Sequence, residues 1–71
     1  MKIKVNGEEY LTDRDTVAQL LKEMDILPER VAVEVNLSIV RRSSFGDFRL
    51  KEGDCVEIVY FVGGGRLWKI N

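Results

Sequence analysis

The first twelve residues show the alternation of apolar and polar positions that is typical of a β-hairpin. Residues 2–5 alternate lysine with an aliphatic residue, which is the period of a strand with one buried face. An Asn-Gly dipeptide follows at 6–7, and it indicates a hairpin because both positions of a tight turn require positive φ. Residues 8–12 form the predicted return strand. A two- or four-residue loop would place Tyr10 on the core side, whereas an odd-numbered loop would place Leu11 there.

A short amphipathic helix is predicted next. Thr16 followed by Gln19 forms a capping box, which satisfies backbone N–H groups at a helix start. Four apolar residues then recur at helical spacing and form one stripe: Val17, Leu20, Leu21 and Met24. Pro28 ends any continuation, because the residue before a proline avoids helical angles. A helix of about ten residues is too short to be stable alone, so we expect it to pack on a sheet.

The second half of the chain predicts further strands around an irregular crossing. Valines alternate with other residues over 31–35, and residues 39–40 are a short apolar pair. Residues 41–49 are polar and irregular, and their two phenylalanines, at 45 and 48, are expected to anchor them to the core. Residues 55–62 are the longest apolar run and are rich in β-branched side chains, which favours a central strand. Its even-numbered residues should face the helix and its odd-numbered residues the open side of the sheet.

These elements predict an α+β fold of the β-grasp kind. Their order is hairpin, helix, strand, irregular crossing and strand, and a strand–helix–strand connection within one sheet is right-handed. The simplest closure lays one main helix across one face of a mixed four- to five-stranded sheet. The chain shows neither internal repeats nor an inter-domain linker, and its 71 residues fit one small domain.

The amino-acid composition excludes several functional classes of protein. Eleven basic residues oppose twelve acidic ones, so the chain lacks the positive field of a nucleic-acid or membrane-surface binder. It has no histidine and one cysteine, Cys55, which argues against an autonomous hydrolase, a metal site or a disulfide framework. No stretch approaches a membrane span, and residues 1–5 lack the apolar core of a signal peptide. We therefore expect a cytoplasmic binding or carrier module that contacts neither nucleic acid nor membrane.

Three consecutive glycines, Gly63, Gly64 and Gly65, follow the most apolar strand directly. Glycine is costly to order, so such a run indicates either a flexible segment or one without room for a Cβ. A hairpin turn or a linker would account for it. Residues 66–70 alternate charged and apolar positions in part and could form a short strand that folds back through a glycine turn. They could equally be a removable extension or non-native residues.

Six segments in a fixed order resemble one known family. They are Met1-Lys-Ile-Lys-Val-Asn-Gly, Thr16-Val-Ala-Gln-Leu-Leu, Val31-Ala-Val-Glu-Val-Asn, Ile39-Val, Gly53-Asp54 and Val59-Tyr-Phe-Val-Gly-Gly-Gly65. Together they resemble the ThiS family, the sulfur carrier proteins of thiamine biosynthesis, which share the ubiquitin-like β-grasp fold with MoaD. The resemblance covers roughly residues 1–65. It implies a sulfur-carrier domain over 1–65 and a C-terminal extension over 66–71.

The resemblance implies a carrier rather than an enzyme. In this family an adenylating enzyme of the ThiF type uses ATP to activate the carboxylate of the last glycine, here Gly65. A sulfur-donor enzyme then supplies the sulfur that displaces AMP, and the thiocarboxylate passes it to a ThiG-type thiazole synthase. The carrier itself holds no cofactor and supplies no catalytic residue. An extended tail of three glycines reaches about 10 Å, which suits entry into a narrow channel.

The chain departs from the family pattern at its end, because six residues follow Gly65. While Gly65 is joined to Arg66 its carbonyl is an amide, so a processing protease must first cut after Gly65. A second departure is Arg41, where these proteins often have proline. The alternatives are a molybdopterin-type sulfur carrier and a non-conjugating β-grasp interaction module.

A docking surface for the partners is expected on the open face of the sheet. Lys4, Val59 and Phe61 combine charge with apolar and aromatic side chains, a composition that is typical of interfaces. Partial cover of this face by the tail is the alternative.

Overall fold

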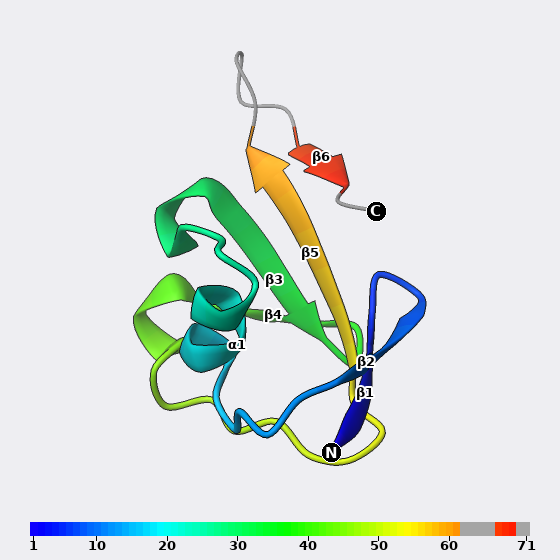
Figure 1. Cartoon of the computed structure of the whole chain (residues 1–71). Helices are drawn as coiled ribbons and strands as arrows, with labels where there is room; N and C mark the ends of the chain where they lie inside the picture. The colour runs from blue at the N-terminus through cyan, green and yellow to red at the C-terminus, as the bar shows by residue number, and fades with distance from the viewer. Residues whose placement is uncertain (62–66, 70–71) are drawn as a thin grey trace.

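One helix lies across one face of a mixed sheet in the computed structural model, which describes residues 1–61 and 67–69 (Figure 1). The elements are β1 (Lys2–Val5), β2 (Glu8–Leu11), α1 (Val17–Glu23), β3 (Val31–Val35), β4 (Ser38–Val40), β5 (Cys55–Phe61) and β6 (Leu67–Lys69), with short 3-10 turns at Pro28–Arg30 and Arg42–Ser44. Five strands follow the order β2-β1-β5-β3-β4, and β6 pairs with β5 off this path. The β1–β5 pair is parallel and the others are antiparallel. The predicted β-grasp arrangement is thus confirmed.

The β1–β2 hairpin has a two-residue turn. Asn6 and Gly7 both have positive φ, at 50° and 86°, as the Asn-Gly pattern predicted. The turn pairs Ile3 with Tyr10, which places the tyrosine against the core. Leu11 faces away and is 76% exposed. The structure therefore selects the even-numbered loop of the two alternatives.

Helix α1 begins as predicted. The Thr16 hydroxyl accepts a hydrogen bond from the Gln19 N–H at 3.2 Å. The Gln19 side chain reaches back to the N–H of Asp15, one residue earlier than in a standard capping box. Three of the four residues of the apolar stripe are fully buried: Val17, Leu20 and Leu21. The fourth, Met24, is the partly buried C-cap.

The end of α1 corrects one expectation. The helix has seven residues and stops well before Pro28, which is therefore not what ends it. Asp25 adopts a positive φ of 64°. The Ile26 N–H then donates to the Leu21 carbonyl at 2.8 Å, and the Asp25 N–H donates to that of Lys22 at 3.1 Å. This is a Schellman motif, in which a left-handed residue closes the last turn.

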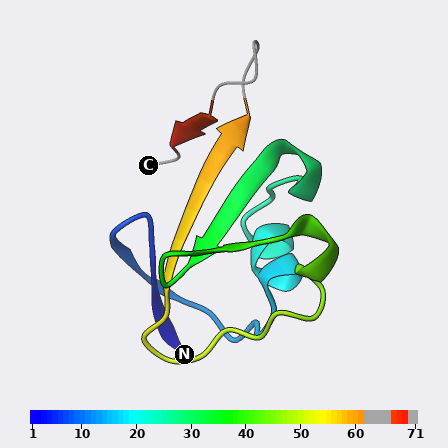
Figure 2. The ribbon, with the colours of Figure 1, turned by 180° about the vertical axis from the view of Figure 1, so that it is seen from behind.

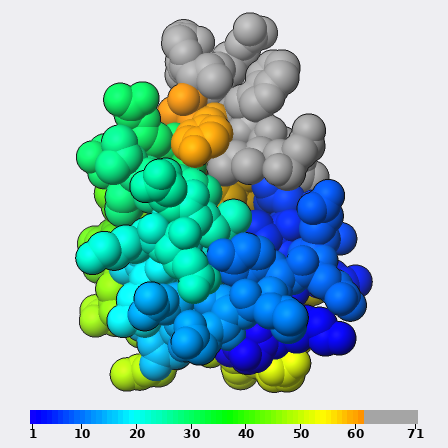
Figure 3. Space-filling view, viewed as in Figure 1, coloured from blue at the N-terminus to red at the C-terminus, as the bar shows by residue number. Residues whose placement is uncertain are grey.

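The core lies between α1 and the inner face of the sheet. Figure 3 shows the helix and the hairpin side by side on one side of the molecule, and Figure 2 shows the ribbon from behind. The predicted anchors of the irregular crossing are confirmed, since Phe45 is buried and Phe48 packs partly buried against the core. Their carbonyls also accept the N–H groups of Ala18 and Val17, so the crossing satisfies the first turn of the helix.

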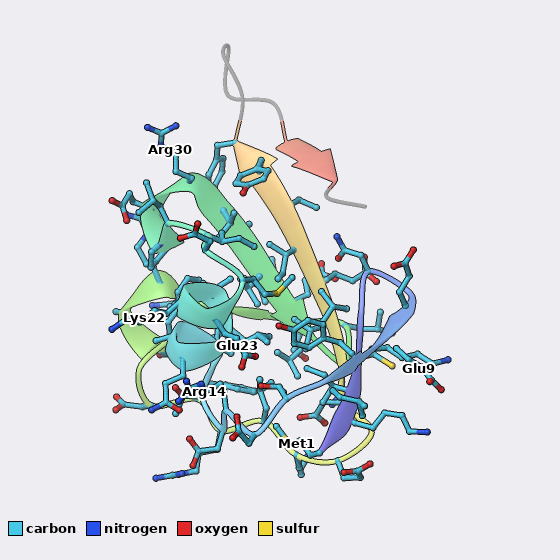
Figure 4. The ribbon with its side chains drawn as sticks, in the orientation of Figure 1. Met1, Glu9, Arg14, Lys22, Glu23 and Arg30 are labelled. Carbon is cyan, nitrogen blue, oxygen red and sulfur yellow. The ribbon has the colours of Figure 1, made fainter. Side chains whose placement is uncertain are left out.

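A carboxylate on α1 ties the helix to the hairpin. Glu23 extends from the helix toward β2, with Arg14 close by (Figure 4). Its Oε1 atom accepts hydrogen bonds from the Tyr10 hydroxyl at 3.1 Å and from the Thr12 hydroxyl at 2.7 Å. Arg14 Nε lies 3.7 Å from its Oε2 atom. Burial raises the pKa of Tyr10, and the hydrogen bond to Glu23 and the charge of Glu23 raise it further.

This pKa shift predicts a loss of stability at alkaline pH. Tyr10 in the unfolded chain releases its proton near pH 10, whereas folded Tyr10 releases it at higher pH. The free energy of unfolding should therefore be insensitive to this group below pH about 10 and fall as the pH rises through the folded pKa. Urea unfolding between pH 9 and about 11, followed by circular dichroism, measures this slope.

The matched variants are Tyr10→Phe and Tyr60→Phe. The fall in the free energy of unfolding that Tyr10 causes at alkaline pH should disappear in Tyr10→Phe and persist in Tyr60→Phe. Equal slopes in the wild type and Tyr10→Phe would show that the Glu23 interaction does not favour the protonated tyrosine.

Candidate functional site

The candidate site is the far end of β5, which leads directly toward the three glycines. Gly63, Gly64 and Gly65, the expected attachment segment, lie outside the described residues, as do Val62 and Arg66. Strand β5 is central, because β1 and β3 both pair with it. It therefore gives the glycine segment a well-anchored origin.

The side chains of β5 alternate as predicted. Val56 and Ile58 are buried beneath α1, and Tyr60 packs against the same core. Cys55 and Phe61 are exposed on the opposite face, with Glu57 and Val59 half-buried there. The strand is thus buried on one face and accessible on the other along its whole described length.

The β1-side edge of β5 is completed by a side chain. The pairing of β1 with β5 ends at Val5 and Val56, and the N–H of Asn6, the next residue, donates to the Val56 carbonyl at 2.8 Å. Beyond it, Asn6 Oδ1 accepts from the Ile58 N–H at 2.8 Å, and Asn6 Nδ2 donates to the Ile58 carbonyl at 3.1 Å. The amide thus bonds Ile58 as a residue of a neighbouring strand would. Sequence reasoning read Asn6 only as a turn residue and missed this contact.

Further along the same edge, β6 pairs antiparallel with β5. The register joins Val59 to Lys69, Tyr60 to Trp68 and Phe61 to Leu67. Figures 1 and 2 both show β6 beside the end of β5. Of the alternatives for the tail, the returning strand is therefore confirmed over Leu67–Lys69.

The three expected docking residues share one face of the sheet, but only two of them are neighbours. Val59 and Phe61 are two positions apart on β5, and Phe61 is 46% exposed. Lys4 pairs with Cys55, four residues earlier on β5 than Val59. That offset corresponds to about 13 Å along the strand. The structure thus brings Val59 and Phe61 together at the end of β5 that precedes the glycines in the sequence, and places Lys4 toward the other end of the strand.

Within residues 1–61 and 67–69, no group of three or more His, Cys, Asp or Glu side chains could hold a metal ion. No helix in the same part of the chain is long and apolar enough to cross a membrane. The exposed thiol of Cys55 lies at the start of β5, at the other end of the strand from Phe61.

Comparison with known proteins gives one consistent family. A family model described as the ThiS family matches residues 3–65. The chain is 32% identical over 65 residues to the sulfur carrier protein ThiS of Bacillus subtilis, covering 89% of this chain and 98% of that protein. The crystal structure of the thiamine biosynthesis protein ThiS from Geobacter metallireducens superposes with a TM-score of 0.80 at 36% identity. That match covers 92% of this chain and 100% of the other.

Two further relatives are much longer proteins. The chain is 42% identical over 67 residues to a thiazole synthase from Magnetococcus marinus, covering 93% of this chain and 21% of the relative. It is 46% identical over 66 residues to a thiazole synthase from Paramagnetospirillum magneticum, covering 92% and 20%. The chain thus spans about a fifth of the length of these relatives.

The role of Asn6 on the β5 edge predicts a specific loss of stability. Asn6→Gly keeps a residue that accepts positive φ but removes the amide that bonds both backbone groups of Ile58. We expect the free energy of unfolding to fall by about 1–2 kcal/mol, measured by urea denaturation.

Leu37→Gly is the matched control. Leu37 has a positive φ of 72° in the β3–β4 turn and is 90% exposed. Its replacement by glycine therefore relieves backbone strain and removes few packing contacts. Glycine there should raise stability by up to about 1 kcal/mol. If Asn6→Gly left the free energy of unfolding unchanged or raised it as Leu37→Gly does, the strand-like role of the Asn6 amide would be refuted.

Proposed function

The chain belongs to the ThiS family, and from this we propose that it is a sulfur carrier of thiamine biosynthesis that carries sulfur on the carboxylate of Gly65. The observation that carries the proposal is the extent of the family match, which runs from residue 3 to Gly65 and ends at the third glycine. The named function of the Bacillus subtilis relative, a sulfur carrier protein matched over almost its full length, supports the same role.

The proposed chemistry begins with processing. A protease hydrolyses the Gly65–Arg66 amide, which frees a carboxylate on Gly65. A carboxylate oxygen then attacks the α-phosphorus of ATP within a ThiF-type activating enzyme and releases pyrophosphate, leaving an acyl-adenylate. A reduced sulfur nucleophile from a sulfur-donor enzyme displaces AMP to give the thiocarboxylate. The carrier acts as substrate in each step, and the partner enzymes supply the acids, bases and nucleotide site.

The fold supplies what this chemistry needs from a carrier. Strand β5 is paired with β3 along one edge, is bonded by β1 and Asn6 as far as Ile58 along the other, and is buried on its inner face, so the strand that leads to the glycines is anchored in residues 1–65 without β6. Val59 and Phe61 offer an apolar contact at the end of β5 that precedes the tail in the sequence, and we propose them as the centre of the docking surface for the activating enzyme. Lys4 contributes charge at the rim, where it affects association rate more than affinity.

Thiazole synthase is the proposed acceptor of the sulfur. The two thiazole synthase relatives carry a segment similar to this chain within a single longer polypeptide. Covalent linkage of two domains raises their effective concentration, which benefits a carrier and the enzyme that consumes its cargo. A carrier on a separate chain would need a docking surface to achieve the same encounter.

A second function is favoured by one observation. The pairing of Leu67–Lys69 with β5 is the arrangement expected of a β-grasp interaction module that never conjugates. A molybdopterin-type carrier is the third alternative, and it would respond to a different acceptor enzyme. Intact mass separates the module from both carriers.

The carrier proposal predicts a mass change that depends on the end of the chain. Residues 1–65, incubated with ATP, a ThiF-type enzyme and a sulfur donor, should gain about 16 Da as oxygen is replaced by sulfur. The chain of residues 1–71 should keep its mass, and so should residues 1–65 without ATP. A truncated chain that is never activated, in the presence of an enzyme active on its own carrier, would support the interaction module.

The docking surface predicts a loss of binding when its aromatic residue is truncated. Phe61→Ser in the 1–65 form should weaken binding to the activating enzyme by about tenfold, the effect of losing a central interface side chain. Leu11→Ser is the matched control, because Leu11 is also a large exposed apolar side chain but lies on the edge strand β2. Equal losses in the two variants, measured by calorimetry, would place the interface elsewhere.

A further inference from the structure

The backbone groups of Tyr60 lie on the edge of β5 that β6 covers. In a strand, N–H and C=O groups of residues two apart point to the same side. Ile58 directs both groups toward the β1 side, where Asn6 bonds them. Tyr60 must therefore direct its own groups to that side as well, opposite Trp68.

This alternation assigns the hydrogen bonds of the β5–β6 pair. Bonded and non-bonded pairs alternate along an antiparallel ladder. Since Tyr60 and Trp68 are partners in register, theirs is the hydrogen-bonded pair. The N–H groups of Leu67 and Lys69, the neighbours of Trp68, then point away from β5.

Along this edge of β5, three different partners follow one another. Val56 pairs with Val5 of β1 and accepts the N–H of Asn6, the Asn6 side chain bonds Ile58, and β6 lies opposite Tyr60. Without β6, the Tyr60 groups form a one-residue acceptor site for an extended strand. The occupant of that site is the segment Leu67–Lys69 of the same chain.

We propose that this segment is an autoinhibitory latch, whose pairing with β5 must open before the chain can be cut after Gly65. The proposal rests on the proposed function, which requires that cut. Phe61 and Leu67 are paired across the ladder, so their Cα atoms are about 5 Å apart. An extended path of six peptide units between them spans about 20 Å. A protease that binds its substrate in an extended conformation around the cleaved bond needs a separation of Phe61 and Leu67 closer to the second distance, and the paired state does not allow it.

The latch is short, so it slows cleavage without preventing it. Only Leu67–Lys69 pair with β5 among the described tail residues. When opening and closing are fast, proteolysis follows the population of the open form. Weakening the single hydrogen-bonded pair should therefore raise the cleavage rate in proportion to that population.

Trypsin tests this without any knowledge of the natural protease, because it cuts after Arg66, one bond beyond Gly65. Trp68→Pro removes the N–H that points to Tyr60, whereas Lys69→Pro removes one that points away from β5. Each rate is divided by that of the same bond in a peptide of residues 60–71 with the same substitution. Trp68→Pro should accelerate cleavage of the folded protein by about tenfold, and Lys69→Pro by less than about twofold.

Amide hydrogen exchange gives an independent readout. In Trp68→Pro the exchange of the Tyr60 N–H should accelerate, while that of Ile58, bonded to Asn6, should stay unchanged. An unaltered Tyr60 exchange, or equal acceleration of cleavage by both proline variants, overturns the latch. Neither measurement uses the activating enzyme, so the latch can fail while residues 1–65 still gain sulfur. Conversely, the latch can hold in a chain that is never activated.

Discussion

The pairing of β5 along both of its edges is the constraint on which the rest of the structure depends. Strand β5 is buried against α1 on one face, so backbone N–H and C=O groups left without partners there would be costly. Strand β3 covers one edge throughout Val56–Tyr60. On the other edge, β1 reaches only as far as Val56. The Asn6 side chain bonds Ile58 beyond it, and β6 pairs with the end of β5. A well-paired β5 anchors the strand from which the sequence continues into the glycines.

Two asparagines in hairpin turns serve this constraint in the same way. Asn6 and Asn36 both have positive φ, at 50° and 52°. Each directs its Oδ1 atom to a backbone N–H of β5, that of Ile58 at 2.8 Å and that of Cys55 at 2.9 Å. Asparagine suits both tasks because it tolerates left-handed angles and carries a donor and an acceptor on one short side chain. The turns that end the β1 and β3 strands thus also hold the central strand.

The inner face of the sheet contributes to stability, and the outer face carries the proposed binding residues. The inner face carries the core and, at its margin, the Glu23 network that joins α1 to the hairpin. The outer face carries Val59 and Phe61 at the end of β5, just before the proposed reactive tail in the sequence. A carrier that visits several enzymes in turn needs such a division, because residues recruited for docking contribute little to the core and can be exchanged without unfolding it.

Short-range patterns were sufficient to predict most of the strands, the buried stripe of α1 and the faces of β5, because each depends on residues within a few positions of one another. Six such segments, in a fixed order along the chain, indicated the family. The same patterns placed the glycines after β5, and they left both the hairpin loop and the tail open between alternatives. Tertiary structure decided the rest. Asn6 meets Ile58 across 52 positions, Lys4 lies apart from Phe61, Asp25 rather than Pro28 ends the helix, and Leu67–Lys69 take the free edge at Tyr60. Most of these depend on which strand lies beside which. Periodicity shows only which face of a strand is buried, whereas strand order and the hydrogen bonds at a strand edge are fixed when distant segments pack together.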